Sequence, residues 1–220
     1  MSIADNIKKI KSEIPSQVKL VVVTKTHPVE KILEAYNAGQ KIFGENRVQE
    51  LVEKQKQLPK DIEWHLIGHL QTNKVKQIAY YISLIHSVDS LKLLKEINKC
   101  AAKENRVIDC LLQIYIAKEE TKFGLSFEEA EELLRSEEFK QMKNIRIIGL
   151  MGMATLTENE MQIKNEFRSL KQFYDKICQL LIANCQLAVL SMGMSSDYKL
   201  AIEEGSNLIR VGSLIFGDRT

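Results

Sequence analysis

The 220-residue sequence is poor in cysteine, proline and glycine, with 4, 3 and 10 residues respectively. So few prolines and glycines exclude a collagenous or low-complexity chain. The four cysteines form neither a C-x-x-C pair of the kind that binds zinc nor a small disulfide framework. We interpret them as small apolar residues in a reducing compartment, and the sequence therefore predicts an ordered, cytoplasmic protein.

Charge of one sign and long apolar runs are also scarce. The 31 basic and 29 acidic residues leave a net charge of +2, which argues against a nucleic-acid partner. No run approaches the ~20 apolar residues that span a bilayer, and the charged first 14 residues do not resemble a secretory signal. We expect a single domain over residues 1–220, and a monomer because no extra apolar stripe indicates an obligate dimer.

Short apolar runs alternate with amphipathic segments along the whole chain. Most of these runs are continuously apolar, which is typical of strands buried on both faces of a parallel sheet. The predicted strands are 18–25, 41–46, 63–68, 84–88, 109–116, 146–151, 187–193 and 208–217.

Helix signals separate the predicted strands and complete a repeating strand–helix pattern. We expect seven intervening helices, among them 28–39, 126–139 with a Ser126–Glu129 capping box, and 159–181, plus an extra N-terminal helix over 2–13. Eight units of about 27 residues predict a compact (β/α)₈ barrel of the TIM type. An open doubly wound sheet is the alternative architecture.

Lys25 closes the first predicted strand, directly after three valines and a threonine. In a parallel barrel the carboxyl ends of the strands form the mouth of the active site. Burial there lowers the pKa of an amine and prepares it to form imines with carbonyl compounds. The alternative is that Lys25 extends from the rim into solvent.

Small and hydroxyl residues gather after the seventh and eighth strands. Ser191 and Ser195 belong to the segment S-M-G-M-S-S-D, and Gly212 and Ser213 follow Arg210. Backbone N–H groups exposed in such loops suit a phosphate, and phosphate sites recur at these strands in barrels. The alternative is that the glycines only permit tight turns.

The segment W-H-L-I-G-H-L-Q contains His65 and His69, which invites a metal-site interpretation. On a strand, however, four residues span ~13 Å, too far for one ion to bind both rings. We expect instead a rim position for His65 or His69, in contact with a ligand or a neighbouring strand. The polar cluster that contains Asn46 lies at the same mouth.

An imine-forming amine and a phosphate site together indicate a phosphorylated aldehyde. Pyridoxal 5′-phosphate is the commonest such ligand, and Arg210 is the natural partner for its pyridine nitrogen. A barrel with a Schiff-base lysine and no pyridoxal phosphate, as in class I aldolases, is a further alternative.

The segments VVVTKTHP, IFGENRVQE, WHLIGHLQTNK, GLMGMAT and LSMGMSSDYKLAIEEGSNLIRVGSLIFG together resemble the YggS/PROSC family of pyridoxal phosphate homeostasis proteins. The resemblance runs over residues 18–217 and implies a barrel similar to the N-terminal domain of alanine racemase (PLP fold type III). It also implies that Lys25 forms the Schiff base and that Arg210 faces the pyridine nitrogen. The other implied cofactor contacts are Asn46 and His65 along the pocket wall and Ser191, Ser195, Gly212 and Ser213 around the phosphate.

The resemblance implies a protein that buffers and delivers pyridoxal phosphate in vitamin B6 homeostasis, with PLP-dependent apo-enzymes as candidate partners. It leaves the role of Lys122, a lysine that recurs in the family, undefined. Two arguments oppose an enzyme: an arginine does not readily protonate the pyridine nitrogen, and we expect no second domain to supply an opposing acid or base. The alternative function is an amino-acid racemase, decarboxylase or lyase of the alanine racemase barrel type.

Overall fold

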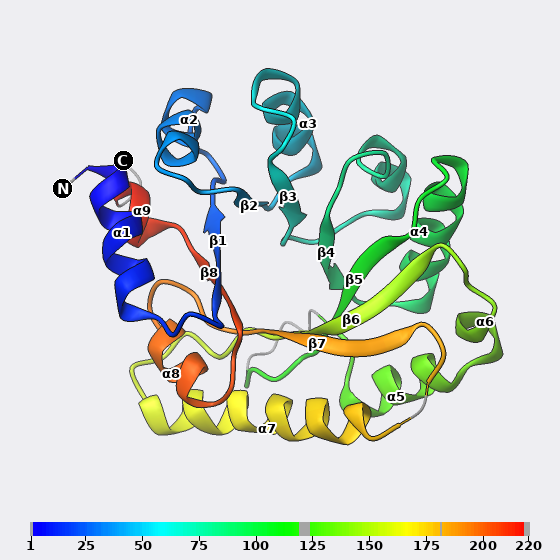
Figure 1. Ribbon diagram of the computed structural model, residues 1–220. Coiled ribbons are helices and arrows are strands. Elements are labelled where there is room, and N and C mark those ends of the chain that lie inside the picture. The colour runs from blue at the N-terminus through cyan, green and yellow to red at the C-terminus, as the bar shows by residue number, and fades with distance from the viewer. Residues whose placement is uncertain (1, 119–123, 181, 218–220) are drawn as a thin grey trace.

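The structure is a computed structural model that describes residues 2–118, 124–180 and 182–217. Its eight parallel strands pair in chain order and close into a barrel where β8 returns to β1 (Figure 1). This closure confirms the predicted (β/α)₈ barrel over the open doubly wound sheet. The strands are β1 (Lys19–Val23), β2 (Ile42–Glu45), β3 (Glu63–Leu66), β4 (Leu84–Val88), β5 (Ile108–Gln113), β6 (Ile145–Met151), β7 (Cys185–Ser191) and β8 (Leu208–Val211).

Helices surround the barrel, and the predicted N-terminal helix precedes β1 as α1 (Figure 1). The connection after β3 is a 3₁₀ helix, η1, where we expected an α-helix. The helices are α1 (Ile3–Glu13), α2 (Val29–Asn37), α3 (Val48–Gln57), η1 (Thr72–Gln77), α4 (Leu91–Lys103), α5 (Phe127–Arg135), α6 (Glu137–Lys140), α7 (Glu160–Cys178), α8 (Tyr198–Glu203) and α9 (Ser213–Phe216).

The capping box predicted at Ser126 and Glu129 is present at the start of α5. The prediction of one continuous helix over 126–139 is wrong, because the backbone at Ser136 is extended (φ −64°, ψ 145°) and separates α5 from α6. The Ser136 hydroxyl caps the new helix by accepting a hydrogen bond from the Phe139 amide at 3.2 Å. This second turn buries the Phe139 ring completely.

The predicted strand 208–217 is also too long. The strand ends at Val211, Gly212 leaves the extended conformation, and α9 follows it. The α9 helix lies beside α1, where the Asn6 side chain donates a hydrogen bond to the Ile215 carbonyl at 2.9 Å (Figure 1). Ile215 is therefore buried by a helix–helix contact and not within the sheet.

The apolar core has two parts. The larger cluster fills the space between strands and helices and includes Phe43 and Trp64, whose ring centroids lie 6.0 Å apart. A separate small cluster consists of Leu84, Leu111 and Met151, which lie on β4, β5 and β6. Because side chains alternate between the two faces of a barrel strand, these residues occupy the interior.

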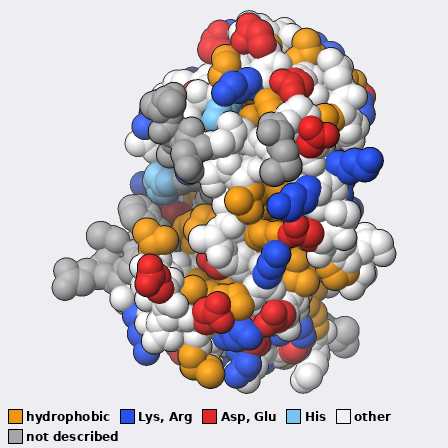
Figure 2. Space-filling model, turned by 90° about the vertical axis from the view of Figure 1, so that its left-hand side faces the viewer, with side chains coloured by type: hydrophobic (Ala, Val, Ile, Leu, Met, Phe, Trp, Pro, Cys, Tyr) orange, Lys and Arg blue, Asp and Glu red, His pale blue; other side chains and the backbone are white. Residues whose placement is uncertain are grey.

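Charged side chains of both signs are interspersed on the face that carries α1 (Figure 2). Ion pairs connect the helices there, for example Lys199 to Glu13 at 3.1 Å and Lys164 to Glu203 at 2.7 Å. Across the described ranges, no helix is both long and apolar enough to cross a membrane.

Gly149 on β6 pairs with Val189 on β7, next to an irregularity in the register of these strands. A Cβ atom at Gly149 would overlap the backbone oxygen of Val189, so we expect Gly149→Ala to lower the free energy of unfolding by about 3 kcal/mol. Gly39→Ala is the control, since Gly39 has open space around it. Its φ of +86° is strained for alanine, which should lower the free energy of unfolding by only about 1 kcal/mol. Equal losses for both variants in urea unfolding would contradict this account of the β6–β7 contact.

Candidate functional site

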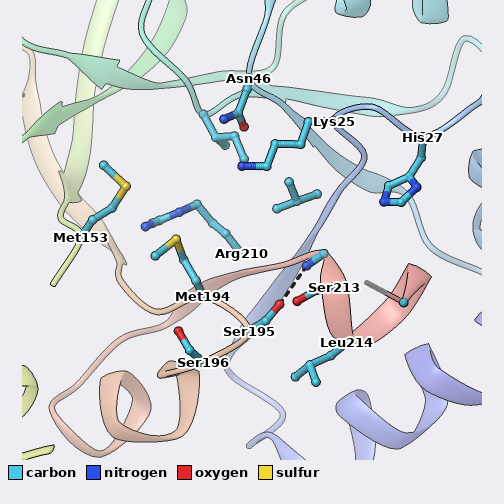
Figure 3. A pocket seen from close by; sticks show the side chains of 14 residues that line it. Lys25, His27, Asn46, Met153, Met194, Ser195, Ser196, Arg210, Ser213 and Leu214 are labelled. Carbon is cyan, nitrogen blue, oxygen red and sulfur yellow. Dashed lines mark hydrogen bonds between the residues drawn. The ribbon is translucent and has the colours of Figure 1, made fainter. Parts of the chain in front are cut away.

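A pocket of about 410 Å³ opens at the carboxyl ends of the strands, where Lys25, Asn46 and Arg210 converge from β1, β2 and β8 (Figure 3). Its apolar wall includes Val23, Ile67, Met153, Met194 and Leu214. Its other lining residues are Lys25, His27, Asn46, Ser195, Ser196, Arg210, Gly212, Ser213 and Gly217.

Lys25 lies two residues after β1, which ends at Val23 and not at Lys25 as predicted. Its half-buried side chain points into the pocket, beside Asn46 (Figure 3). The pairing of Val23 with Gly44 aligns the ends of β1 and β2, which places these two side chains on the same side of the mouth. Lys25, which the sequence analysis selected as the candidate amine, therefore reaches the interior of the pocket.

A buried ion pair lies behind Lys25. The Lys54 ammonium donates hydrogen bonds to the Thr24 carbonyl at 2.8 Å and to Glu45 Oε1 at 2.5 Å. The Thr24 hydroxyl also donates to Glu45 Oε1, at 2.6 Å. Burial raises the pKa of Glu45 and the nearby Lys54 opposes that shift, so the carboxylate depends on its cation to stay charged.

The residue after Lys25 has a left-handed backbone. Thr26 has a φ of +67°, which is uncommon for a β-branched residue, and its amide donates to Glu50 Oε2 at 2.8 Å. Glu50 also lies 3.3 Å from the Lys54 ammonium. Lys54 and its two carboxylate partners thus hold the backbone on both sides of Lys25, a role that the sequence analysis missed.

The loops after β7 and β8 form the opposite wall of the pocket. The Gly212 amide donates to the Ser195 hydroxyl at 3.3 Å, and Ser213 lies beside them (Figure 3). Gly193 has a φ of +89°, and a Cβ there would lie 2.8 Å from the Tyr198 Cα, so this loop requires glycine. Its carbonyl accepts a hydrogen bond from the Arg210 amide at 3.0 Å, which ties the two loops together.

Arg210 is buried, with 3% of its surface exposed, yet it lines the pocket. Its guanidinium donates to the carbonyl and hydroxyl of Ser191, at 2.9 and 2.6 Å, and to the Gly152 carbonyl at 3.1 Å. Burial lowers the pKa of Arg210 to about 10, against the opposing effect of Asp197. The guanidinium therefore remains a cation at neutral pH.

The structure gathers most of the predicted cofactor contacts in one pocket, namely Lys25, Asn46, Ser195, Arg210, Gly212 and Ser213. Ser191 and His65 are not among the lining residues. Ser191 lies behind Arg210, and His65 is buried in the barrel, 3.0 Å from His86. His69 is exposed outside the pocket, 3.3 Å from Asp89.

Lys122 lies outside the described residues. The sequence analysis missed His27, whose ring lines the pocket and lies 4.3 Å from the ring of Phe216. Its place two residues after Lys25 was the available signal. It also missed Met153 and Met194, which no spacing rule distinguishes from core methionines.

Removal of the Lys54 cation tests how much the buried pair with Glu45 stabilises the protein around Lys25. We expect Lys54→Met to lower the free energy of unfolding by about 3 kcal/mol, because Glu45 is left as an unpaired buried carboxylate. Lys56→Met is the matched control, since its pair with Glu53 is exposed and should be worth less than about 0.5 kcal/mol. Adding Glu45→Gln to Lys54→Met should restore part of the loss in urea unfolding. Equal stability of the two single variants would show that the pair is not structural.

Comparison with known proteins agrees with this geometry. The family model of the alanine racemase N-terminal domain matches residues 1–220. The pyridoxal phosphate homeostasis protein of Aquifex aeolicus is 44% identical over 202 residues, which cover 91% of this chain and 87% of that protein.

Solved structures show the same relationship. PipY of Synechococcus elongatus PCC7942, determined with PLP bound, superposes with a TM-score of 0.87 at 37% identity, covering 98% of this chain and 100% of PipY. The alanine racemase of Clostridium difficile 630 has a TM-score of 0.78 at 15% identity and matches 99% of this chain but 57% of its own, a likeness of fold alone. The chain therefore belongs to the alanine racemase N-terminal domain family and, within it, to the pyridoxal phosphate homeostasis proteins.

Proposed function

We propose that residues 1–220 act as one pyridoxal 5′-phosphate-binding barrel that holds the cofactor through a Schiff base to Lys25. The observation that carries this proposal is the arrangement of the pocket: an amine on one wall faces hydroxyls, a backbone amide and a guanidinium on the other (Figure 3). A phosphorylated aldehyde needs this combination of groups, so the residues present fit the cofactor.

Each group has a separate task in this proposal. The Lys25 amine condenses with the cofactor aldehyde and releases water, while Ser195, Gly212 and Ser213 hold the phosphate. Arg210 donates to the pyridine nitrogen and, because it stays protonated, does not readily transfer a proton to it. PipY, which is 37% identical to this chain, has been solved with PLP bound, and this supports the assignment.

We further propose that the protein buffers the cofactor and delivers it to PLP-dependent apo-enzymes, and that it does not catalyse a reaction on amino acids. Among the described lining residues, the ionisable side chains are Lys25, His27 and Arg210, and none is a carboxylate, tyrosine or cysteine. A racemase needs an acid and a base on opposite faces of its substrate. Arg210 is unsuited to that exchange, and His27 packs against Phe216.

We also propose a monomer in the cytoplasm. All four cysteines are free, as is usual in a reducing compartment. The relatives named as pyridoxal phosphate homeostasis proteins support a role in the homeostasis of this cofactor.

Lys25→Ala should abolish cofactor attachment and leave the fold intact. We expect the variant to lose the visible absorption band of the PLP-loaded protein, with unfolding free energy changed by less than about 1 kcal/mol, because a half-buried lysine contributes little packing. The check is absorbance, followed by borohydride reduction and peptide mass spectrometry.

Lys199→Ala is the control, since this lysine lies next to the same loops but its side chain is 68% exposed. It should keep both the band and the reduced pyridoxyl adduct at Lys25. An adduct on another lysine of the unmodified sequence, or none at all, would contradict the proposed attachment. If no preparation contained PLP or showed the visible absorption band, the aldolase-type alternative would be favoured.

The non-catalytic assignment is tested with amino acids as probes. Incubation of the PLP-loaded protein with the common L-amino acids in D₂O should give no more than about one exchange of the α-proton per protein, because the pocket lacks a suitable acid–base pair. Proton NMR follows the exchange. Sustained exchange over many equivalents would overturn the non-catalytic assignment. Formation of the D-amino acid would then identify a racemase, and release of carbon dioxide a decarboxylase.

A further inference from the structure

Four polar side chains form a chain of hydrogen bonds across the interior of the barrel. The Arg210 guanidinium donates to Ser191 Oγ at 2.6 Å, and that oxygen lies 3.2 Å from His86 Nδ1. His86 Nε2 in turn lies 3.0 Å from His65 Nδ1. All four residues are at most 5% exposed, so their hydrogen-bonding groups have little access to water. His86 belongs to β4 and was assigned no role by the sequence.

Which group donates in each of these hydrogen bonds follows from Arg210, whose guanidinium can only donate. A guanidinium has no acceptor, so Ser191 Oγ must accept from Arg210. The hydroxyl has a single proton, and its other partner among the described residues is His86. A buried hydroxyl proton without an acceptor is costly, so the proton goes to His86 Nδ1.

The same reasoning assigns both imidazole rings. With Nδ1 acting as acceptor, neutral His86 carries its proton on Nε2 and donates it to His65 Nδ1. His65 is then also the Nε2–H form. Burial lowers the pKa of His65 to about 3 and that of His86 well below its usual value, in agreement with two neutral rings beside a buried cation.

The hydrogen bonds of this network also limit the orientation of the Arg210 guanidinium. Ser191 takes two hydrogen bonds from Nη1, and the Gly152 carbonyl takes one from Nη2. Of the five N–H groups of an arginine, Nε–H and one on Nη2 remain for a ligand in the pocket. Ser191 Oγ accepts from Arg210 and directs its own proton to His86, so both of its described contacts are satisfied in one orientation of the hydroxyl.

We propose that His86, oriented by His65, is a positioning residue for Arg210. The two neutral rings direct their Nδ1 lone pairs toward the cation, hold the Ser191 hydroxyl in one orientation and thereby fix the plane of the guanidinium that faces the pocket. Only the identity of the ligand, pyridoxal phosphate, rests on the proposed function; the arrangement of the four side chains does not depend on it.

The first test therefore uses the protein without cofactor. In ¹⁵N-histidine spectra, we expect two rings, assigned by His65→Gln and His86→Asn, to be in the Nε2–H form and to remain neutral down to pH 5. Side-chain ¹⁵N spectra should show Arg210 with restricted rotation of its Nη groups. An Nδ1–H form for His86, or protonation of either ring near pH 6.5, would overturn the proposal whether or not the protein binds PLP.

Variants then separate positioning from simple structural support. We expect His86→Leu to free the rotation of the Arg210 Nη groups and to weaken binding of pyridoxal phosphate roughly tenfold, with Lys25 still able to form the reduced adduct. His86→Asn should restore most of both properties, because its amide oxygen can accept the Ser191 proton near the place of Nδ1. His69→Leu is the control, since His69 is exposed and outside this chain of contacts.

The positioning role of His86 can be tested even if His86→Leu fails to fold. Should His86→Leu not fold, the ring tautomers and the comparison of His86→Asn with the unmodified protein carry the test. Unchanged Arg210 rotation and unchanged PLP affinity in a folded His86→Leu would overturn the positioning role. Loss of PLP binding in every protein, with the expected tautomers and restricted Arg210, would instead count against the proposed function alone.

Discussion

The pairing of β8 with β1 is the contact on which the candidate site depends. It places Val21 beside Arg210 and so brings Lys25 into one pocket with Gly212 and Ser213, from opposite ends of the chain. In an open sheet these segments would lie at different edges. Closure also leaves a space at the carboxyl ends that is bounded by strands on all sides, in which a lysine, an arginine and hydroxyl groups can converge.

Closure has an energetic consequence, because it buries the Arg210 cation. A buried charge is tolerated only when hydrogen bonds and an opposite charge replace water. Ser191 and Gly152 accept from the guanidinium, and Asp197 lies close enough to favour its charged form. Because Ser191 must also place its own proton, the polar contacts extend inward to His86, and the histidines stay neutral next to the cation.

The amine side of the pocket is organised differently, from outside the barrel. Lys54 on α3 reaches the Thr24 carbonyl and Glu45, and Glu50 of the same helix holds the Thr26 amide. The left-handed Thr26 is thus held by Glu50, and the same helix carries the Lys54 cation that balances Glu45. The side chain of Lys25, between Thr24 and Thr26, points into the pocket (Figure 3). The two walls therefore have separate supports, one inside the barrel and one outside it.

Local patterns in the sequence determined the strand and helix order, the Ser126 cap and the assignment of Lys25 and Arg210 to one mouth, because apolar periodicity and capping residues act over a few positions. They did not determine where 208–217 leaves the sheet, since burial of Ile215 against α1 depends on a helix about two hundred residues away. Nor did they determine the break at Ser136, which accompanies the complete burial of the Phe139 ring. The depth of His65, its contact with His86 and the pairing of Lys54 with Glu45 were decided by the tertiary structure. Strand pairing and interior burial set which polar groups must satisfy one another.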